Sequence, residues 1–294
     1  MVKGKGIEKA VIPVAGFGTR LLPATKAQPK EMLPIVDKPA VQYVVEEAVN
    51  SGIEDILLVT GRNKRAIEDY FDYAVELERE LESKGKTELL NIVRNVSEMV
   101  SIYYVRQKIA KGLGDAIYHA KGFVSDEPFG VLLADDIIDA DVPVLKQMID
   151  VFENHKGIIL AVMEVPIQDT KLYGIIEGKK IGDRLYEVSN LVEKPEPMEA
   201  PSNIAIVGRY ILTPSIFESL ENTPPGKNGE VQITDAIKNL AHKEKIYAYK
   251  FEGTRFDVGE KLGYLKANIA FALKRKDIGK EFKKYLLEVL KEAE

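Results

Sequence analysis

The sequence predicts an α/β protein with a doubly wound, mostly parallel sheet, a mixed second half and a C-terminal helix. Short apolar runs that suit buried parallel strands alternate along the chain with amphipathic segments that suit helices. The first apolar run, residues 10–15, leads directly into a turn with glycines at positions 16 and 18. Sheets of this kind bind ligands beyond the carboxyl ends of their strands, so this junction is the first candidate site.

In the first half of the chain, strands and helices are predicted in alternation. Residues 39–51 have an apolar face, with Pro39 at the start and Gly52 just past the end, which is typical of an amphipathic helix. Residues 21–39 contain four prolines, which exclude a regular helix there. The other predicted strands are 56–60, 102–105, 131–134 and 158–165, and the other predicted helical segments are 64–94, 114–122 and 142–154.

The second half has a more mixed pattern, and no internal repeat or low-complexity linker divides it from the first. We therefore expect one domain over residues 1–294, with a first half to about residue 140, a second half to about 260, and C-terminal helices beyond. Strands are predicted at 175–177, 186–192, 204–212 and 246–251, and helices at 232–240, 261–276 and 278–294.

Composition restricts the class of protein. The 41 basic and 46 acidic residues give a net charge of −5 without a basic block, so neither nucleic-acid binding nor membrane binding is indicated. No apolar run approaches the roughly 20 residues that a membrane span requires, and the first nine residues lack the apolar core of a signal peptide. The absence of cysteine excludes disulfides, thiolate metal sites and cysteine nucleophiles. We expect a cytoplasmic enzyme.

The turn after the first strand has the residues of a phosphate site. Gly16 and Gly18 allow the backbone to approach a ligand closely, so that its amides can form an anion-binding concavity. Thr19 adds a hydroxyl, and Arg20 adds a planar set of donors that matches phosphate oxygens. Leu21 stands where a dinucleotide fingerprint has its third glycine, and no Walker loop is present. From these residues alone, an ordinary tight turn is the open alternative.

Two further cations, Lys26 and Lys30, follow within the proline-containing stretch. From Pro13 to Val45 the chain closely resembles the bacterial-type UTP–glucose-1-phosphate uridylyltransferases of the sugar-nucleotidyltransferase superfamily, and further family motifs recur as far as Asp257. This resemblance implies a Rossmann-like fold, with the first half binding the nucleotide and the second half binding the sugar phosphate.

Gln107 follows the predicted strand at 102–105 and precedes a glycine-containing loop. A carboxamide offers both an acceptor and a donor, which can complement the edge of uracil. Taken alone, such a residue is more often a solvated loop glutamine. The resemblance implies that Gln107 binds uracil, and that the backbone at Ala15, Gly16 and Gly112 closes around the nucleoside.

Two adjacent carboxylates, Asp135 and Asp136, end the apolar strand at 131–134. Carboxylates in such a position suit Mg²⁺, which prefers one or two of them together with phosphate oxygens. A helix cap or a turn is the alternative interpretation of the pair. The resemblance implies that Asp135 and Asp257 are the metal ligands, and that Asp136 is a supporting or an exposed neighbour.

The sugar site is expected around Glu193 and Lys194, which precede a proline. The carboxylate can accept hydrogen bonds from two sugar hydroxyls, and the lysine can hold the sugar's phosphate; an exposed ion pair is the alternative. The resemblance also implies close backbone approaches at Gly174 and Gly208. Residues 229–235 resemble another family segment, which we interpret as shaping the pocket.

The activity implied by the resemblance joins UTP and glucose 1-phosphate into UDP-glucose and pyrophosphate. The attacking phosphate oxygen is already anionic, so positioning and cations are needed rather than a general base. We expect Arg20 and Lys30 to hold the triphosphate, Lys194 to hold the incoming phosphate, and Mg²⁺ to bridge the phosphates. The alternatives are a nucleotidyltransferase for another base or sugar, such as a thymidylyltransferase, and a non-catalytic nucleotide-sugar-binding protein.

A homodimer or homotetramer is also expected. The C-terminal stretch places apolar residues at helical spacing among lysines and glutamates, and such a stripe requires a partner. Docking of this helix on its own domain is the open alternative. The stripe consists of Phe282, Leu286, Val289 and Leu290.

Overall fold

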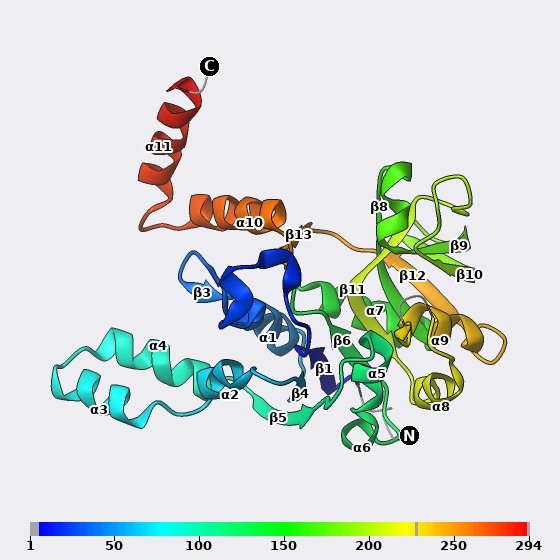
Figure 1. Cartoon of the computed structure of the whole chain (residues 1–294), viewed down its shortest axis with the longest axis horizontal. Helices are drawn as coiled ribbons and strands as arrows, with labels where there is room; N and C mark the ends of the chain where they lie inside the picture. The colour runs from blue at the N-terminus through cyan, green and yellow to red at the C-terminus, as the bar shows by residue number, and fades with distance from the viewer. Residues whose placement is uncertain (1–5, 227–228, 293–294) are drawn as a thin grey trace.

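The computed structural model describes residues 6–226 and 229–292 and contains a nine-stranded sheet (Figure 1). The sheet continues from the first half of the chain into the second. In sheet order the strands are β5 (Ser101–Arg106), β4 (Asp55–Thr60), β1 (Lys9–Pro13), β6 (Phe129–Leu132), β11 (Ile204–Leu212), β8 (Ile158–Glu164), β12 (Ile246–Lys250), β10 (Leu185–Glu193) and β9 (Gly174–Lys180).

The two halves of the sheet differ in strand direction. The order β5-β4-β1-β6 is parallel throughout. Strand β11 then runs antiparallel to both β6 and β8, the pair β8–β12 is parallel, and β10 and β9 close the sheet as antiparallel strands. The expected parallel first half and mixed second half are therefore both present.

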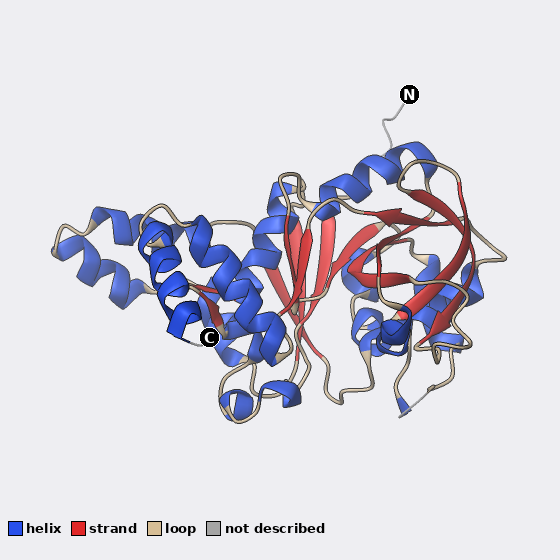
Figure 2. Cartoon of the chain, turned by 90° about the horizontal axis from the view of Figure 1, so that it is seen from above, coloured by secondary structure: helices blue, strands red, loops and turns tan. Residues whose placement is uncertain are grey.

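Helices cover both faces of the sheet, as a doubly wound fold requires (Figure 2). Alternate residues of β1 show why: Ala10 and Ile12 pack into one core cluster, whereas Val11 packs into the other. The helices are α1 (Ala40–Asn50), α2 (Arg65–Phe71), α3 (Val75–Ser83), α4 (Thr87–Ser97), α5 (Leu113–Tyr118), α6 (Lys121–Val124), α7 (Val144–His155), α8 (Ser215–Asn222), α9 (Ile233–Leu240), α10 (Lys261–Lys274) and α11 (Gly279–Glu292).

Several elements differ from the sequence expectation. The helical segment expected over 64–94 is three helices, and helix α8 was not expected. The proline-containing stretch forms the short 3₁₀ helices η1 (Thr19–Leu21), η2 (Ala24–Lys26) and η3 (Lys30–Met32) and the strand pair β2 (Pro34–Ile35) and β3 (Lys38–Pro39), and a further 3₁₀ helix is η4 (Ile167–Leu172). These segments are too short for hydrophobic periodicity to identify them.

A second small sheet, also not expected, positions part of the site. Strand β7 (Asp136–Asp139) pairs antiparallel with β13 (Thr254–Asp257), and the register sets Asp136 opposite Asp257. This pairing brings β13, which is distant in the sequence, close to the end of β6.

Helix α11 extends away from the sheet at the C-terminal end of the chain (Figure 1). Only Gly279 is buried in it, and Val289 and Leu290 are exposed. Docking of this helix on its own domain is therefore not observed in the described residues. No helix in the described part of the chain has the length and apolar character needed to cross a membrane.

Candidate active site

The glycine-rich turn lies directly beyond β1, as expected from the sequence. Gly18 has φ 67° and ψ 32°, a left-handed conformation that glycine adopts at little cost. A Cβ at this position would stand 3.1 Å from Cβ of Lys30 and 3.2 Å from Cγ2 of Thr25. Thr25 also donates from Oγ1 to the Gly18 carbonyl at 2.7 Å. The turn is thus folded against the segment that carries Lys30, while Thr19 and Arg20 remain exposed.

Four charged side chains from distant parts of the chain meet at this turn. Lys30 Nζ lies 2.6 Å from Asp135 Oδ2. Arg20 links the two carboxylates, at 3.5 Å from Asp135 and 3.2 Å from Asp257. Because the Arg20 side chain is 56% exposed, it remains accessible to a ligand. The structure therefore brings together the two cations and the two carboxylates that the sequence singled out.

The charged side chains of this cluster shift one another's pKa values. Burial disfavours the ionised form of Asp135, but the charge and hydrogen bond of Lys30, together with Arg20, outweigh it and hold the pKa of Asp135 below its usual value. Burial likewise acts to lower the pKa of Lys30, but Asp135 and Glu31 raise it above its ordinary value. Both groups are accordingly charged at neutral pH.

The segment around Asp257 is fixed by backbone contacts. Asp257 Oδ1 accepts from the Gly259 amide at 3.0 Å, and the Val258 amide donates to the Asp135 carbonyl at 2.8 Å. A Cβ on Gly259 would stand 2.6 Å from Arg20 Nη2 and 2.8 Å from Asp135 Oδ2. Glycine is needed here because any side chain would fill the space between the two carboxylates.

Asp136 is buried, so the expectation that it might be exposed is wrong. It pairs with Arg255, and its Oδ2 accepts from the Gly208 amide at 2.8 Å. The Gly208 carbonyl in turn accepts from the Leu133 amide at 2.8 Å. Both backbone groups of Gly208 are thus engaged within the protein. These contacts agree with the alternative expectation, that Asp136 is a supporting neighbour.

Gln107 is 5% exposed, which excludes a solvated loop glutamine. Its main-chain amide donates to the Thr60 carbonyl at 2.8 Å, which extends the pairing of β4 and β5. Its side-chain Nε2 donates to Asp115 Oδ2 at 2.6 Å and to the Gly112 carbonyl at 3.3 Å. The donor half of the carboxamide is therefore occupied within the protein.

Glu193 and Lys194 line a pocket of about 300 Å³ at the end of β10. Glu193 Oε2 accepts from Thr234 Oγ1 at 2.7 Å, and Glu193 Oε1 lies 3.3 Å from Lys194 Nζ. Gly174 stands opposite Glu193 in the register of β9 and β10. The pocket is lined by Leu191, Val192, Glu193, Lys194, Glu230, Gln232, Asp235 and Lys238.

Comparison with known proteins shows the family to which this chain belongs. Residues 9–273 match the family model described as nucleotidyl transferase. A UTP–glucose-1-phosphate uridylyltransferase of Bacillus subtilis (strain 168) is 52% identical over 290 residues, which cover 99% of each chain. This chain belongs to the nucleotidyl transferase family, among the uridylyltransferases.

Solved structures of the uridylyltransferases have the same fold. A UTP-bound UGPase from Acinetobacter baumannii is 43% identical with a TM-score of 0.90, covering 96% of this chain and 99% of that one. A UDP-glucose pyrophosphorylase complexed with UDP-glucose is 47% identical with a TM-score of 0.83, covering 92% and 100%. The resemblance inferred from the motifs is confirmed.

Some residues around this candidate site were not found from the sequence. Glu31 and Lys64 form a buried ion pair at 2.7 Å beside Lys30. Arg255 holds Asp136, and Asp115 holds Gln107. None has a distinctive local motif, although Arg255 and Asp115 each stand within a few residues of a motif that was recognised.

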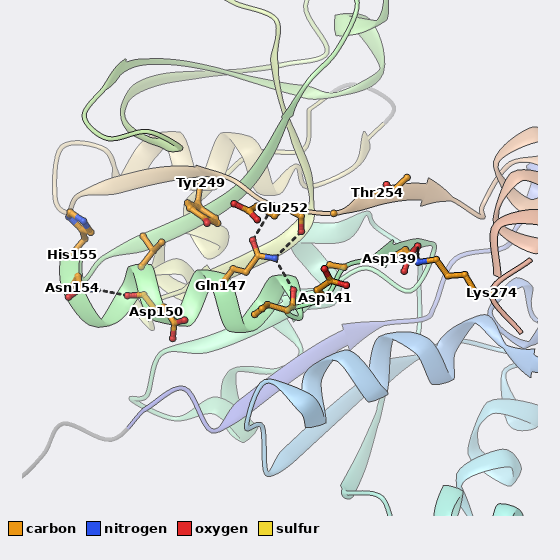
Figure 3. Close-up of a pocket in the computed structure, with 14 residues that line it drawn as sticks. Asp139, Asp141, Gln147, Asp150, Asn154, His155, Tyr249, Glu252, Thr254 and Lys274 are labelled. Carbon is orange, nitrogen blue, oxygen red and sulfur yellow. Dashed lines mark hydrogen bonds and ion pairs between the residues drawn. The ribbon is translucent and has the colours of Figure 1, made fainter. Parts of the chain in front are cut away.

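A larger groove, of about 720 Å³, is lined by none of these residues and lies between α7 and the strands β7, β12 and β13 (Figure 3). Asp139, Asp141, Asp150 and Glu252 line it, and its Lys274 is paired with Asp139. Its Gln147 carboxamide is bonded to backbone at Val142 and Glu252. This concentration of carboxylates would repel the phosphates of a nucleotide.

Proposed function

We propose that this chain transfers the uridylyl group of UTP to glucose 1-phosphate, giving UDP-glucose and pyrophosphate. The proposal rests on one observation: Arg20, Lys30, Asp135 and Asp257 form a cluster beyond the carboxyl ends of the parallel strands. Its residues are those expected for binding a polyanion and a divalent cation. The names of the uridylyltransferase relatives supply the substrates.

The chemistry is a direct displacement at the α-phosphorus of UTP. An oxygen of the sugar phosphate forms the new bond to phosphorus, and the bond from that phosphorus to the pyrophosphate oxygen breaks. No proton needs to be removed from the nucleophile, because it is already anionic. The protein must instead overcome the repulsion between two polyanions, by orientation and by fixed positive charge.

The cations of the chain are arranged for this purpose. Arg20 and Lys30, beside the glycine-rich turn, would hold the triphosphate and the departing pyrophosphate. Lys194 would hold the phosphate of the sugar; its side chain is 46% exposed beside Glu193. Glu193 and the backbone at Gly174 would contact the sugar. Gly208, expected to do the same, would instead hold Asp136 through its amide.

Asp135 and Asp257 suit a magnesium ion, because their carboxylates converge beside Gly259; the Arg20 guanidinium now links them there and would have to make room for the ion. In the part of the chain that the structure describes, no group of three or more His, Cys, Asp or Glu side chains could hold a metal by itself. Mg²⁺ commonly uses one or two carboxylates and takes its other ligands from phosphates and water. When bound, Mg²⁺ would supply charge neutralisation at the phosphate oxygens.

The nucleoside would bind at the ends of β1 and β5. Gln107 would face the base, while backbone at Ala15, Gly16 and Gly112 would close around the nucleoside. Gly16 is exposed at the mouth of the site, and Thr19 begins η1 next to the expected phosphates.

The test is pyrophosphate release across a panel of nucleotides and sugar phosphates. UTP with glucose 1-phosphate should be the preferred pair over CTP, dTTP or ATP, and over galactose 1-phosphate or N-acetylglucosamine 1-phosphate. A preference for dTTP would favour the thymidylyltransferase alternative. Binding of UDP-glucose without any pyrophosphate release would favour the non-catalytic one.

A further inference from the structure

The orientation of the Gln107 carboxamide is determined by Asp115. A primary amide has two N–H donors and one carbonyl acceptor. Nε2 of Gln107 directs its donors to Asp115 Oδ2 at 2.6 Å and to the Gly112 carbonyl at 3.3 Å. Both partners can only accept, because a carboxylate and a carbonyl have no proton to give. The opposite orientation would set the Gln107 oxygen against two acceptors, and it is therefore disfavoured.

The surroundings strengthen this preference. The Gln107 residue is 5% exposed, so a misoriented amide could not exchange its lost hydrogen bonds for water. Asp115 lies in the first turn of α5, where its side chain is 20% exposed. The start of α5 is itself fixed, because the Gly114 amide donates to the Val231 carbonyl at 2.9 Å. The acceptor that orients Gln107 is thus held on a fixed element.

The Gln107 side chain can offer a ligand only one group, the acceptor oxygen Oε1. Among the described residues, none donates to its Oε1. Position 3 of uracil carries an N–H, which such an oxygen can accept. Position 3 of cytosine is an unprotonated nitrogen with a lone pair, which would face the same oxygen as a second acceptor. Recognition by one acceptor differs from the acceptor-and-donor pairing expected from the sequence.

We propose that Asp115 is a positioning residue that sets the choice of uracil over cytosine by fixing the orientation of Gln107. The inference rests on the proposed function, because it takes Gln107 to face the base of the nucleotide. Asp115 acts through Gln107 and touches no reacting atom. A residue that only tied α5 to the loop would affect stability and leave the choice of base unchanged.

The experiment compares UTP and CTP as substrates with glucose 1-phosphate for the Asp115→Asn variant. An asparagine can donate as well as accept, so only the longer contact to the Gly112 carbonyl, at 3.3 Å, still favours one orientation of the Gln107 carboxamide. We expect the ratio of kcat/KM for UTP to that for CTP to fall at least tenfold, through a higher KM for UTP and a lower KM for CTP. The kcat for UTP should change little, because the phosphate-binding residues are untouched.

Two further variants complete the test. Asp126→Asn makes the same chemical change at an exposed position before β6 and should leave the UTP to CTP ratio unchanged. Asp115→Glu keeps an obligatory acceptor and should retain most of the preference for UTP. Unchanged UTP to CTP ratios in folded Asp115→Asn and Asp115→Ala proteins would overturn the inference.

The readouts separate this inference from the proposed function. If the unmutated protein releases no pyrophosphate from UTP and glucose 1-phosphate, the proposed function fails. Calorimetric titration with UDP and CDP then tests the orientation of Gln107 without catalysis, and equal affinity of the unmutated protein for both would overturn it. If Asp115→Asn is unfolded at the assay temperature, as thermal melting would reveal, the same titration of Asp115→Ala at low temperature decides.

Discussion

The adjacent carboxylates Asp135 and Asp136 show how strongly side-chain direction decides the role of a residue. Asp135 meets Lys30 and Arg20 at the mouth of the site. Asp136 points into the protein, where burial raises its pKa and Arg255 acts against that rise. Two identical residues next to each other therefore have different chemical environments, and their substitution should have different effects.

Asp135→Asn should lower turnover by two or more orders of magnitude, on the order of 3 kcal/mol, because it removes charge at the place where the phosphates and the metal meet. Asp136→Asn should leave more turnover and instead lower stability, because Arg255 loses the nearer of its two charged partners, Asp136 and Asp257. Steady-state kinetics and thermal melting of both variants check this contrast. EDTA should abolish turnover and Mg²⁺ should restore it. Near-normal turnover of Asp135→Asn, or activity in EDTA, would require another catalytic centre.

Gln107→Ala should weaken UTP binding by about 1–3 kcal/mol, since it leaves buried polar partners without their hydrogen bonds. Asp115 would lose its neutral donor as well, so part of this cost would be structural. Titration of the variant with UTP and with CTP measures how much of the loss in affinity is specific to uracil. Equal rates with UTP and CTP in the unmutated protein would contradict a role of Gln107 in base choice.

At the scale of elements, the site depends on short segments that buried contacts hold in place. The short helix η3 carries both Lys30, which faces Asp135, and Glu31, which is buried against Lys64. Burial raises the pKa of Glu31, while Lys64 and then Lys30 act to lower it. Burial also lowers the pKa of Lys64, against the charge of Glu31. The Oε1 atom of Glu31 is buried with no partner among the described residues, so its charge relies on Lys64.

Lys64→Met should therefore destabilise the protein by about 3 kcal/mol at neutral pH, because a buried carboxylate loses its partner. The pKa of Glu31 is already raised, and loss of Lys64 raises it further. The folded variant then takes up a proton at a higher pH than the unfolded chain, so its deficit should shrink as pH falls through the raised value toward the ordinary one. Urea unfolding of both proteins at several pH values measures this. A deficit independent of pH would mean that Glu31 is not the group responsible.

At the scale of the whole molecule, α10 and α11 give the C-terminal end an apolar surface. Leu262, Leu265, Ile269 and Leu273 are exposed on α10, and Tyr285, Leu287, Val289 and Leu290 are exposed on α11. Phe282 and Leu286, the other members of the expected stripe, are only half-buried. A helix with so little cover from its own domain favours contact with a second copy.

We expect a dimer or a tetramer at micromolar concentration, measured by light scattering. Leu290→Asp should shift the distribution toward monomer, because it introduces a charge into the apolar surface. Lys291→Asp, a change at the neighbouring polar position, serves as the matched control and should shift it less. A monomeric unmutated protein would contradict the prediction.

The sequence by itself determined the features that depend on neighbouring residues. The entry of β1 into the turn from Gly16 to Arg20, the amphipathic helix α1, and the carboxylates at the end of β6 all follow from local pattern. Periodicity and turn chemistry are properties of short segments, so one chain suffices to find them. The family motifs added residues such as Asp257, which would otherwise have passed for an ordinary turn residue.

The tertiary structure alone decided which residues touch. The pairing of β13 with β7 sets Asp257 opposite Asp136 and so brings it to the neighbour Asp135, and no local pattern encodes that register. It also decided that Asp136 is buried against Arg255, that Lys64 neutralises Glu31, and that Asp115 orients Gln107. The physical reason is the same in each case. Burial and hydrogen-bond partners arise when distant segments pack together, and they fix the charge and direction of a side chain that its own neighbours in sequence leave free.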